Sequence, residues 1–127
     1  MLMYDDESDE GAGMKYLMMV VSDPEAADRP ADPAVDEVED WVSRNDAAGK
    51  RVIGERLRPP EAATTVRRRG GELLVTDGPF TESREWIAGF DVLECDDLDE
   101  AIAIAATHPM VAAGTIELRP FWPFDEA

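Results

Sequence analysis

The segment from residue 75 to residue 85, VTDGPFTESRE, carries the side chains best suited to chemistry. Asp77 stands directly before a Gly-Pro turn, and Phe80, Glu82 and Glu85 follow within eight residues. A carboxylate at the point where a strand opens into a loop can act as a general acid or base. Asp before Gly-Pro can also accept backbone N–H bonds and hold the turn. Asp77 is therefore a candidate catalytic residue with a structural alternative.

His108 is the only histidine of the chain, and Glu82 is the second carboxylate of the Asp77 loop. Imidazole has an unperturbed pKa near neutrality, so His108 could serve as a base together with Asp77 or Glu82. The alternative is that His108, in Thr-His-Pro, ends a helix whose dipole favours a positive charge there. We take both His108 and Glu82 as catalytic candidates.

Four further side chains are candidates for substrate binding: Phe80, Glu85, Trp86 and Arg119. Phe80 and Trp86 could hold an apolar ring, whereas Glu85 and Arg119 could anchor polar groups. Each has a simpler explanation. Glu85 could be a solvated loop residue, Arg119 a paired charge at an interface, and Trp86, like Trp41 and Phe90, a core residue.

The composition argues against most cofactor chemistry. One Cys, Cys95, and one His cannot build a thiolate or imidazole zinc site. A carboxylate-bound divalent cation stays open because acids are plentiful. No Gly-x-Ser-x-Gly elbow is present for a Ser nucleophile. We therefore expect neither a metal site nor an organic cofactor.

The charge argues against nucleic acid and membrane partners. The 127 residues include 12 basic and 29 acidic side chains, giving a net charge of −17 that repels phosphate backbones and anionic lipids. No apolar run approaches a membrane span of about 20 residues. Arg67, Arg68 and Arg69 form the only basic run, which we interpret as charges guarding an exposed strand edge. A cytoplasmic location is expected.

Residues 1–13 are acidic, contain no base, and predict a flexible extension before one folded domain, residues 14–127. In that domain, hydrophobic periodicity and turn residues predict strands and helices in alternation. The expected strands are 14–21, 51–57, 64–69, 72–75, 86–95 and 115–121, and the expected helices run from Asp32-Pro33 to about Gly49 and from Asp97 to His108. With the Gly-Gly hairpin set aside, the order is βαββαβ, which predicts a ferredoxin-like α+β fold with an inserted hairpin.

Right-handed crossovers put both helices on one face of such a sheet. The other face then needs cover, and the chain has no third layer to supply it. A second copy is the economical cover, so we expect a homodimer with its sheets face to face, a dimeric α+β barrel.

The chain resembles the YCII-related proteins, in the branch named for its Asp-Gly-Pro-Phe motif. The similarity spans Met14 to Phe121. It is carried by MKYLMMV, GERLRPPEAATTVR, VTDGPFTESREWIAGFDVLECDDLDEAIAIAATHP and GTIELRPF. Several motifs in one order are much more specific than one short pattern.

The resemblance implies a dimeric α+β barrel. Some broader relatives are enzymes that act on small ring compounds, for example removing chloride from chlorinated hydroxyquinols. There a His–Asp pair, with the His near the first helix, is the proposed acid–base centre. This chain has no His between Met1 and Thr107. The branch is also linked with extracytoplasmic-function sigma factors.

Two functions follow from these observations. The first is a small-molecule binder or cofactor-independent isomerase or lyase, with a pocket near the Asp77 loop. The second is a non-catalytic dimeric regulatory protein whose acidic surface holds a basic partner, such as a sigma factor.

Overall fold

Strands and helices alternate along the chain in the computed structural model, which describes residues 13–25, 29–80, 83 and 85–126. The predicted acidic extension lies almost wholly outside these residues. The elements are β1 (Met14–Ser22), α1 (Val35–Ala47), β2 (Arg51–Arg56), a 3-10 turn (Pro60–Ala62), β3 (Thr64–Arg69), β4 (Glu72–Asp77), β5 (Trp86–Cys95), α2 (Leu98–Ala106), α3 (Met110–Ala113) and β6 (Thr115–Pro120).

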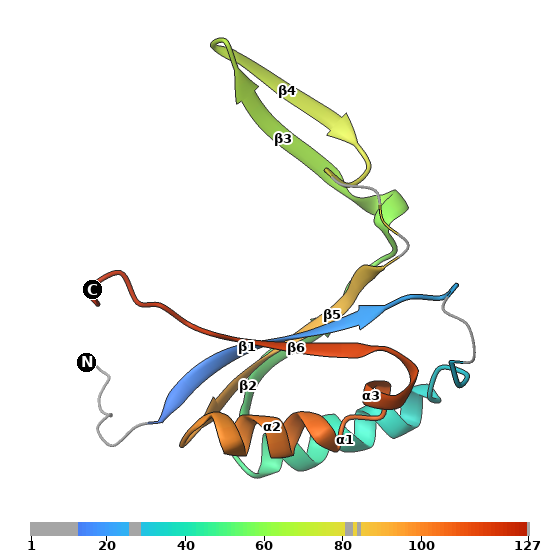
Figure 1. Ribbon diagram of the computed structural model, residues 1–127, viewed down its shortest axis with the longest axis vertical. Coiled ribbons are helices and arrows are strands. Elements are labelled where there is room, and N and C mark those ends of the chain that lie inside the picture. Colours follow the sequence, from blue (N-terminus) through green and yellow to red (C-terminus); the bar gives the residue numbers. More distant parts are fainter. Residues whose placement is uncertain (1–12, 26–28, 81–82, 84, 127) are drawn as a thin grey trace.

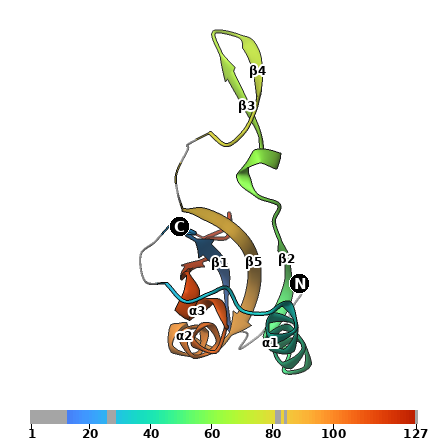
Figure 2. The same ribbon diagram turned by 90° about the vertical axis from the view of Figure 1, so that its right-hand side faces the viewer.

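The main sheet has four antiparallel strands in the order β2-β5-β1-β6. This order and the alternation with helices confirm the predicted ferredoxin-like α+β fold. All three helices lie on one side of the sheet, as Figures 1 and 2 show from perpendicular directions. No helix in the described part of the chain is long and apolar enough to cross a membrane.

The core lies between the sheet and the helices. Along β1, from Tyr16 onward, buried and partly buried side chains alternate strictly. Tyr16, Met18 and Val20 are buried on the helix side, and the residues between them are only partly buried. The buried hydrophobic cluster comprises Tyr16, Met18, Val20, Trp41, Leu93, Cys95, Ala101, Ala105, Met110 and Ala113. The prediction that Trp41 is a core residue is confirmed.

Trp41 ties α1 to the end of α2. Its side chain is fully buried, and its Nε1–H donates to the carbonyl of Ile104 (3.2 Å) and to the hydroxyl of Thr107 (3.0 Å). Buried indole groups usually find such partners. The contact also places the indole ring next to the loop that follows α2.

We call the other side of the sheet the open face. It is formed by Ile53 and Glu55 of β2, Phe90 and Val92 of β5, Leu17 and Met19 of β1, and Glu117 and Arg119 of β6. No helix of the described chain covers it. The prediction that Trp86 and Phe90 are core residues is wrong: the buried side chains of β5 are those of Asp91, Leu93 and Cys95.

Two details of the helices also differ from the predictions. α1 begins at Val35, not at Pro33, because the Glu37 carboxylate accepts the Ala34 N–H (3.0 Å) while Asp32 pairs with Arg29. The short helix α3, directly after His108-Pro109, was not predicted. α1 ends as expected before Gly49, which has φ +72°.

The strands β3 and β4 form a separate two-stranded sheet, which we call the arm. Gly70 and Gly71 have positive φ values of 57° and 84°. A two-residue β-hairpin loop of type I′ requires positive φ at both of its central residues. Figures 1 and 2 show the arm projecting from the open-face side of the main sheet.

The N-terminus of α2 is capped by Asp97, whose carboxylate accepts the N–H of Glu100 (2.9 Å). We expect Asp97→Ala to lower the free energy of unfolding by about 1 kcal/mol, since the cap satisfies an otherwise unpaired N–H. Asp99→Ala removes a first-turn charge without a cap, and should cost only about 0.3 kcal/mol. Urea unfolding of both variants checks this, and equal losses would contradict it.

Candidate functional site

Asp77 lies at the end of β4, at the base of the arm, and is exposed. Its carboxylate has no hydrogen-bond or ion-pair partner within the described residues. The turn after it is held by other groups: the Gly78 N–H donates to the Ala63 carbonyl (2.7 Å), and the Thr65 hydroxyl donates to the Gly78 carbonyl (2.8 Å). The expected turn-holding role is therefore carried by backbone and Thr65.

The other predicted site residues of this loop do not gather around Asp77 in the described part of the chain. Phe80 is 70% exposed, with the Arg67 guanidinium 5.5 Å from its ring centroid. Glu85 and Trp86 line a hollow of about 650 Å³ at the base of the arm, together with prolines 59, 60 and 79. Glu82 lies outside the described residues. Asp77 does not line this hollow, so its part in catalysis stays a prediction.

Arg119 lies on the open face, where it pairs with Glu117 of the same strand. Its side chain is 67% exposed. This pairing matches the simpler explanation of Arg119, because both charges are satisfied at a surface.

His108 lies on the opposite side of the sheet from the arm, between α2 and α3, and is only 4% exposed. Its ring meets the Trp41 ring edge to face at a centroid distance of 4.6 Å. Its Nδ1 accepts the Met110 N–H (3.0 Å), so the proton of the neutral ring is on Nε2. The structure therefore does not bring His108 and Asp77 together.

A cavity of about 450 Å³ lies beside His108, between α1 and the helix-facing side of β2 and β5. Its apolar lining comes mainly from valines and methionine, and charged side chains lie among them. The lining residues are Val20, Pro33, Val35, Val38, Val42, Gly54, Ala88, Gly89, Phe90 and Met110, with Asp32, Glu39, Arg51, Glu55, Arg56, Asp91 and His108. Of these, Glu55 and Phe90 have their side chains on the open face. A concave apolar site with a few polar groups is typical of small-molecule binding.

Arg51 and Asp91 form a buried ion pair in the cavity wall. The Arg51 Nε donates to Asp91 Oδ1 (2.6 Å), and the Asp91 side chain is 8% exposed. The rest of the guanidinium is held by Asp46 (3.0 Å) and the Gly54 carbonyl (2.9 Å). Arg51 therefore fixes one carboxylate oxygen of Asp91 in place.

Burial raises the pKa of Asp91, and the hydrogen bond and charge of Arg51 offset this only in part. Oδ2 of the same carboxylate has no hydrogen-bond partner anywhere in the described chain. Burial also lowers the pKa of His108 to about 4, and its Nε2–H is likewise unpartnered among the described residues. Two residues of the cavity lining thus each carry a buried polar atom without a partner among the described residues: an acceptor on Asp91 and a donor on His108.

Gly54 makes this arrangement possible. A Cβ at this position would overlap the Asp91 carboxylate, the Phe90 carbonyl and the Arg51 guanidinium. Only glycine leaves room beside β2 for the ion pair of Arg51 and Asp91.

Asp91 and Arg51 are not among the site residues predicted from the sequence. One signal for Asp91 was available, because Asp91 stands in the alternating strand WIAGFDVLEC at a position equivalent to Leu93 and Cys95. A single acid on the inward face of a strand is a buried charge that needs a partner. Arg51, at the start of β2, carries no comparable signal. Among the described residues, no group of three or more His, Cys, Asp or Glu is placed to hold a metal ion.

Comparison with known proteins agrees with the fold. The family model described as YCII-related domain matches residues 14–125. An uncharacterized protein of Rhizobium meliloti (strain 1021) is 41% identical over 75 residues, which are 58% of this chain and 60% of that protein. The chain therefore spans less than two thirds of that relative.

The lowered pKa of His108 predicts a pH-dependent stability. With a folded-state pKa of about 4 and an unfolded value near 6.5, the unfolded chain binds more protons between these pH values. The contribution of His108 is therefore complete above pH 6.5 and is lost as the pH falls towards 4. We expect about 2 kcal/mol of unfolding free energy to be lost between pH 7.5 and pH 5 on this account.

The His108→Asn variant isolates this effect, because its side-chain oxygen can still accept the Met110 N–H. The difference in unfolding free energy between wild type and variant should shrink by that amount from pH 7.5 to pH 5. Parallel urea-unfolding profiles for the two proteins would show that His108 is not buried as described.

Proposed function

The chain belongs to the YCII-related domain family, and on this premise we propose that it binds a small carbonyl compound in the cavity between α1 and the sheet. There it would move a proton from one atom of this compound to another without an organic cofactor. One observation carries the proposal. Asp91 and His108, 6% and 4% exposed, line the same cavity, and each has one polar atom that no described residue satisfies.

The two polar atoms without a partner among the described residues indicate which chemical groups the ligand should carry. An unsatisfied buried donor or acceptor costs about 1–3 kcal/mol, and a ligand that satisfies it recovers that energy. The His108 Nε2–H requires an acceptor such as a carbonyl oxygen. The Asp91 Oδ2 requires a hydroxyl group or an acidic C–H beside that carbonyl. Valine and methionine side chains around them favour a compact apolar skeleton.

The two environments suit different steps of one reaction. A carboxylate with a raised pKa is a better base near neutral pH than an exposed one. Asp91 Oδ2 would take the proton from the carbon next to the carbonyl. The C–H electron pair would form a carbon–carbon double bond, and the π pair of the carbonyl would move to its oxygen. The neutral His108, whose pKa is about 4, would stabilise that oxygen by donating from Nε2.

Returning the proton at another carbon gives an isomerisation, and losing a leaving group gives an elimination. Both fit an isomerase or lyase that uses no cofactor. In this reaction Arg51 is a positioning residue: it holds Asp91 Oδ1 and leaves Oδ2 free to meet the substrate.

Deuterium exchange tests the proposal. Proton NMR in D₂O would follow exchange next to the carbonyl in a panel of small hydroxyketones and cyclic diketones. We expect the wild-type protein to accelerate exchange of at least one compound, and Asp91→Asn to slow this roughly 10²–10⁴-fold. Asp46→Asn is the matched control, because Asp46 bonds the same Arg51 but does not line the cavity. Equal rates in wild type and Asp91→Asn would refute the assignment.

We also propose that the protein is a homodimer that pairs through the open face. The support is the apolar surface that one chain leaves there: Ile53 is 53% exposed, and Leu17, Met19, Phe90 and Val92 are incompletely buried. Contiguous exposed apolar patches usually mark an interface.

The dimer is tested by Phe90→Glu, which puts a charge at the middle of the open face. We expect sedimentation to show a dimer for wild type and a monomer for this variant at micromolar concentration. Ile102→Glu is the matched control, because Ile102 is 50% exposed on the helix layer and should leave the dimer intact. A monomeric wild type would refute the proposal.

A further inference from the structure

The arm exposes an apolar strip that nothing in the described chain covers. In the register of β3 and β4, Val66 pairs with Val75 and Arg68 pairs with Leu73, so all four side chains share one face. Val66, Leu73 and Val75 are 61%, 56% and 57% exposed. An isolated two-stranded hairpin is marginally stable in water. The arm therefore needs a surface to pack on.

The arm also carries the basic run of an acidic protein. Arg67, Arg68 and Arg69 make no ion pair with any described residue, although the chain has 29 acidic side chains. Among the described residues, Arg68 and Arg69 donate to the carbonyls of Gly71 and Arg68, and Arg67 lies over Phe80. The surface that covers the arm should therefore be both apolar and acidic.

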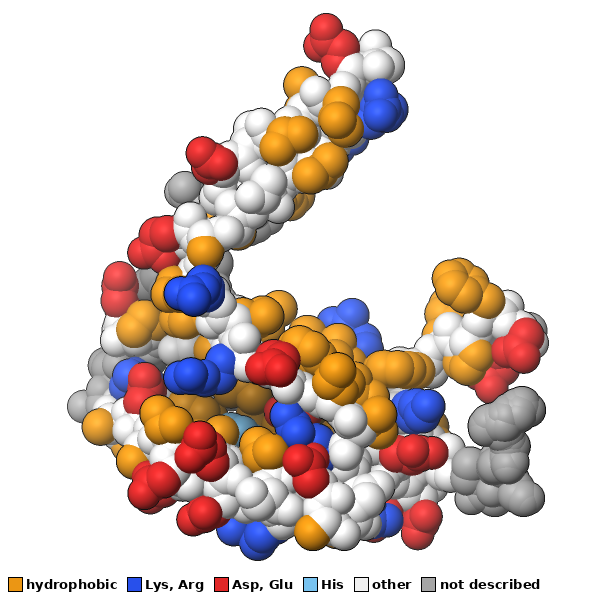
Figure 3. Space-filling view, turned by 180° about the vertical axis from the view of Figure 1, so that it is seen from behind, with side chains coloured by type: hydrophobic (Ala, Val, Ile, Leu, Met, Phe, Trp, Pro, Cys, Tyr) orange, Lys and Arg blue, Asp and Glu red, His pale blue; other side chains and the backbone are white. Residues whose placement is uncertain are grey.

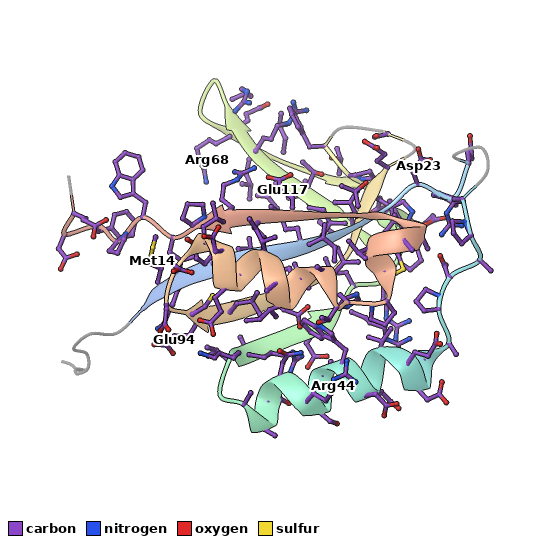
Figure 4. The ribbon with its side chains drawn as sticks, turned by 60° about the horizontal axis from the view of Figure 1, so that its bottom comes forward. Met14, Asp23, Arg44, Arg68, Glu94 and Glu117 are labelled. Carbon is purple, nitrogen blue, oxygen red and sulfur yellow. The ribbon has the colours of Figure 1, made fainter. Side chains whose placement is uncertain are left out.

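The arm and the open face border the same space. Figure 3 shows a deep hollow between them, with hydrophobic side chains on both sides. Figure 4 shows Arg68 of the arm and Glu117 of β6 on the side of the sheet away from Arg44 of α1. Whatever fills the hollow meets both surfaces.

We propose that each arm clasps a second copy of this chain, laying its Val66, Leu73 and Val75 face against the partner. This inference rests on the homodimer proposed above and adds the contact that closes it. A second copy has the required chemistry, since its open face presents apolar side chains beside the Glu55 carboxylate, and its net charge is −17. Two-fold symmetry makes the contact reciprocal, so both arms are covered at once.

Photo-crosslinking identifies what the arm touches. Leu73 is replaced by p-benzoyl-L-phenylalanine in the full chain, and the protein is irradiated at the concentration where sedimentation shows the wild-type dimer. We expect a covalent product of about 28 kDa, twice the 14.0 kDa of one chain. A product that stays at 14.0 kDa and carries an internal cross-link would overturn the clasp, because the arm would then fold onto its own sheet.

Adjacent positions on β4 provide the matched variants. Val75 lies on the apolar face of the arm, and Thr76 lies on the other face. We expect Val75→Asp to raise the dimer dissociation constant about 100-fold, because it buries a charge against the partner. Thr76→Asp should raise it less than about threefold. Equal effects of the two variants would overturn the assigned face, even if both proteins keep the wild-type circular dichroism.

The outcomes separate the two proposals. If wild type is a monomer, the homodimer and the clasp both fail. If wild type is a dimer that Phe90→Glu dissociates, but position 73 cross-links only within its own chain, the clasp alone fails.

Discussion

The structure depends on a sheet whose helices cover only one face. The helices α1 and α2 lie on the same side of the sheet, and no element of the described residues covers the other side. The covered face can therefore bury Trp41, Met18 and Leu93 completely, whereas the open face keeps its apolar side chains partly exposed. The cavity belongs to the first face, and the proposed dimer contact belongs to the second.

The covered face is not wholly apolar, and its few polar groups make up the candidate site. Three polar groups that would each be costly to bury alone lie at its edge: Arg51, Asp91 and His108. The ion pair satisfies Arg51 and half of the Asp91 carboxylate, and Gly54 leaves the space for it. The atoms that remain without a partner among the described residues, Asp91 Oδ2 and His108 Nε2, belong to two residues that line one cavity. Such incomplete satisfaction is more typical of a binding site than of a structural core.

The fold was predictable because its signals are local. The alternation in β1, the Gly-Gly turn of the arm and the Asp97 cap each depend on a few neighbouring residues, and their order is enough to specify βαββαβ. The irregular register between Val20 and Val21 was not predictable, nor was the assignment of Phe90 to the open face. Which face of a strand is buried depends on the elements that pack on it, and both faces of β5 contain apolar residues.

The sequence by itself determined the fold class, the element order and the excess of acidic side chains. Only the tertiary structure decided where a site can form. It separated His108 from Asp77, on opposite sides of the sheet, and placed His108 in the lining of one cavity with Asp91 and Arg51, which come from distant parts of the chain. The physical reason is that a site needs side chains from different elements at one place and removed from water. The spacing of residues along a sequence shows neither their proximity in space nor their burial when they come from different elements.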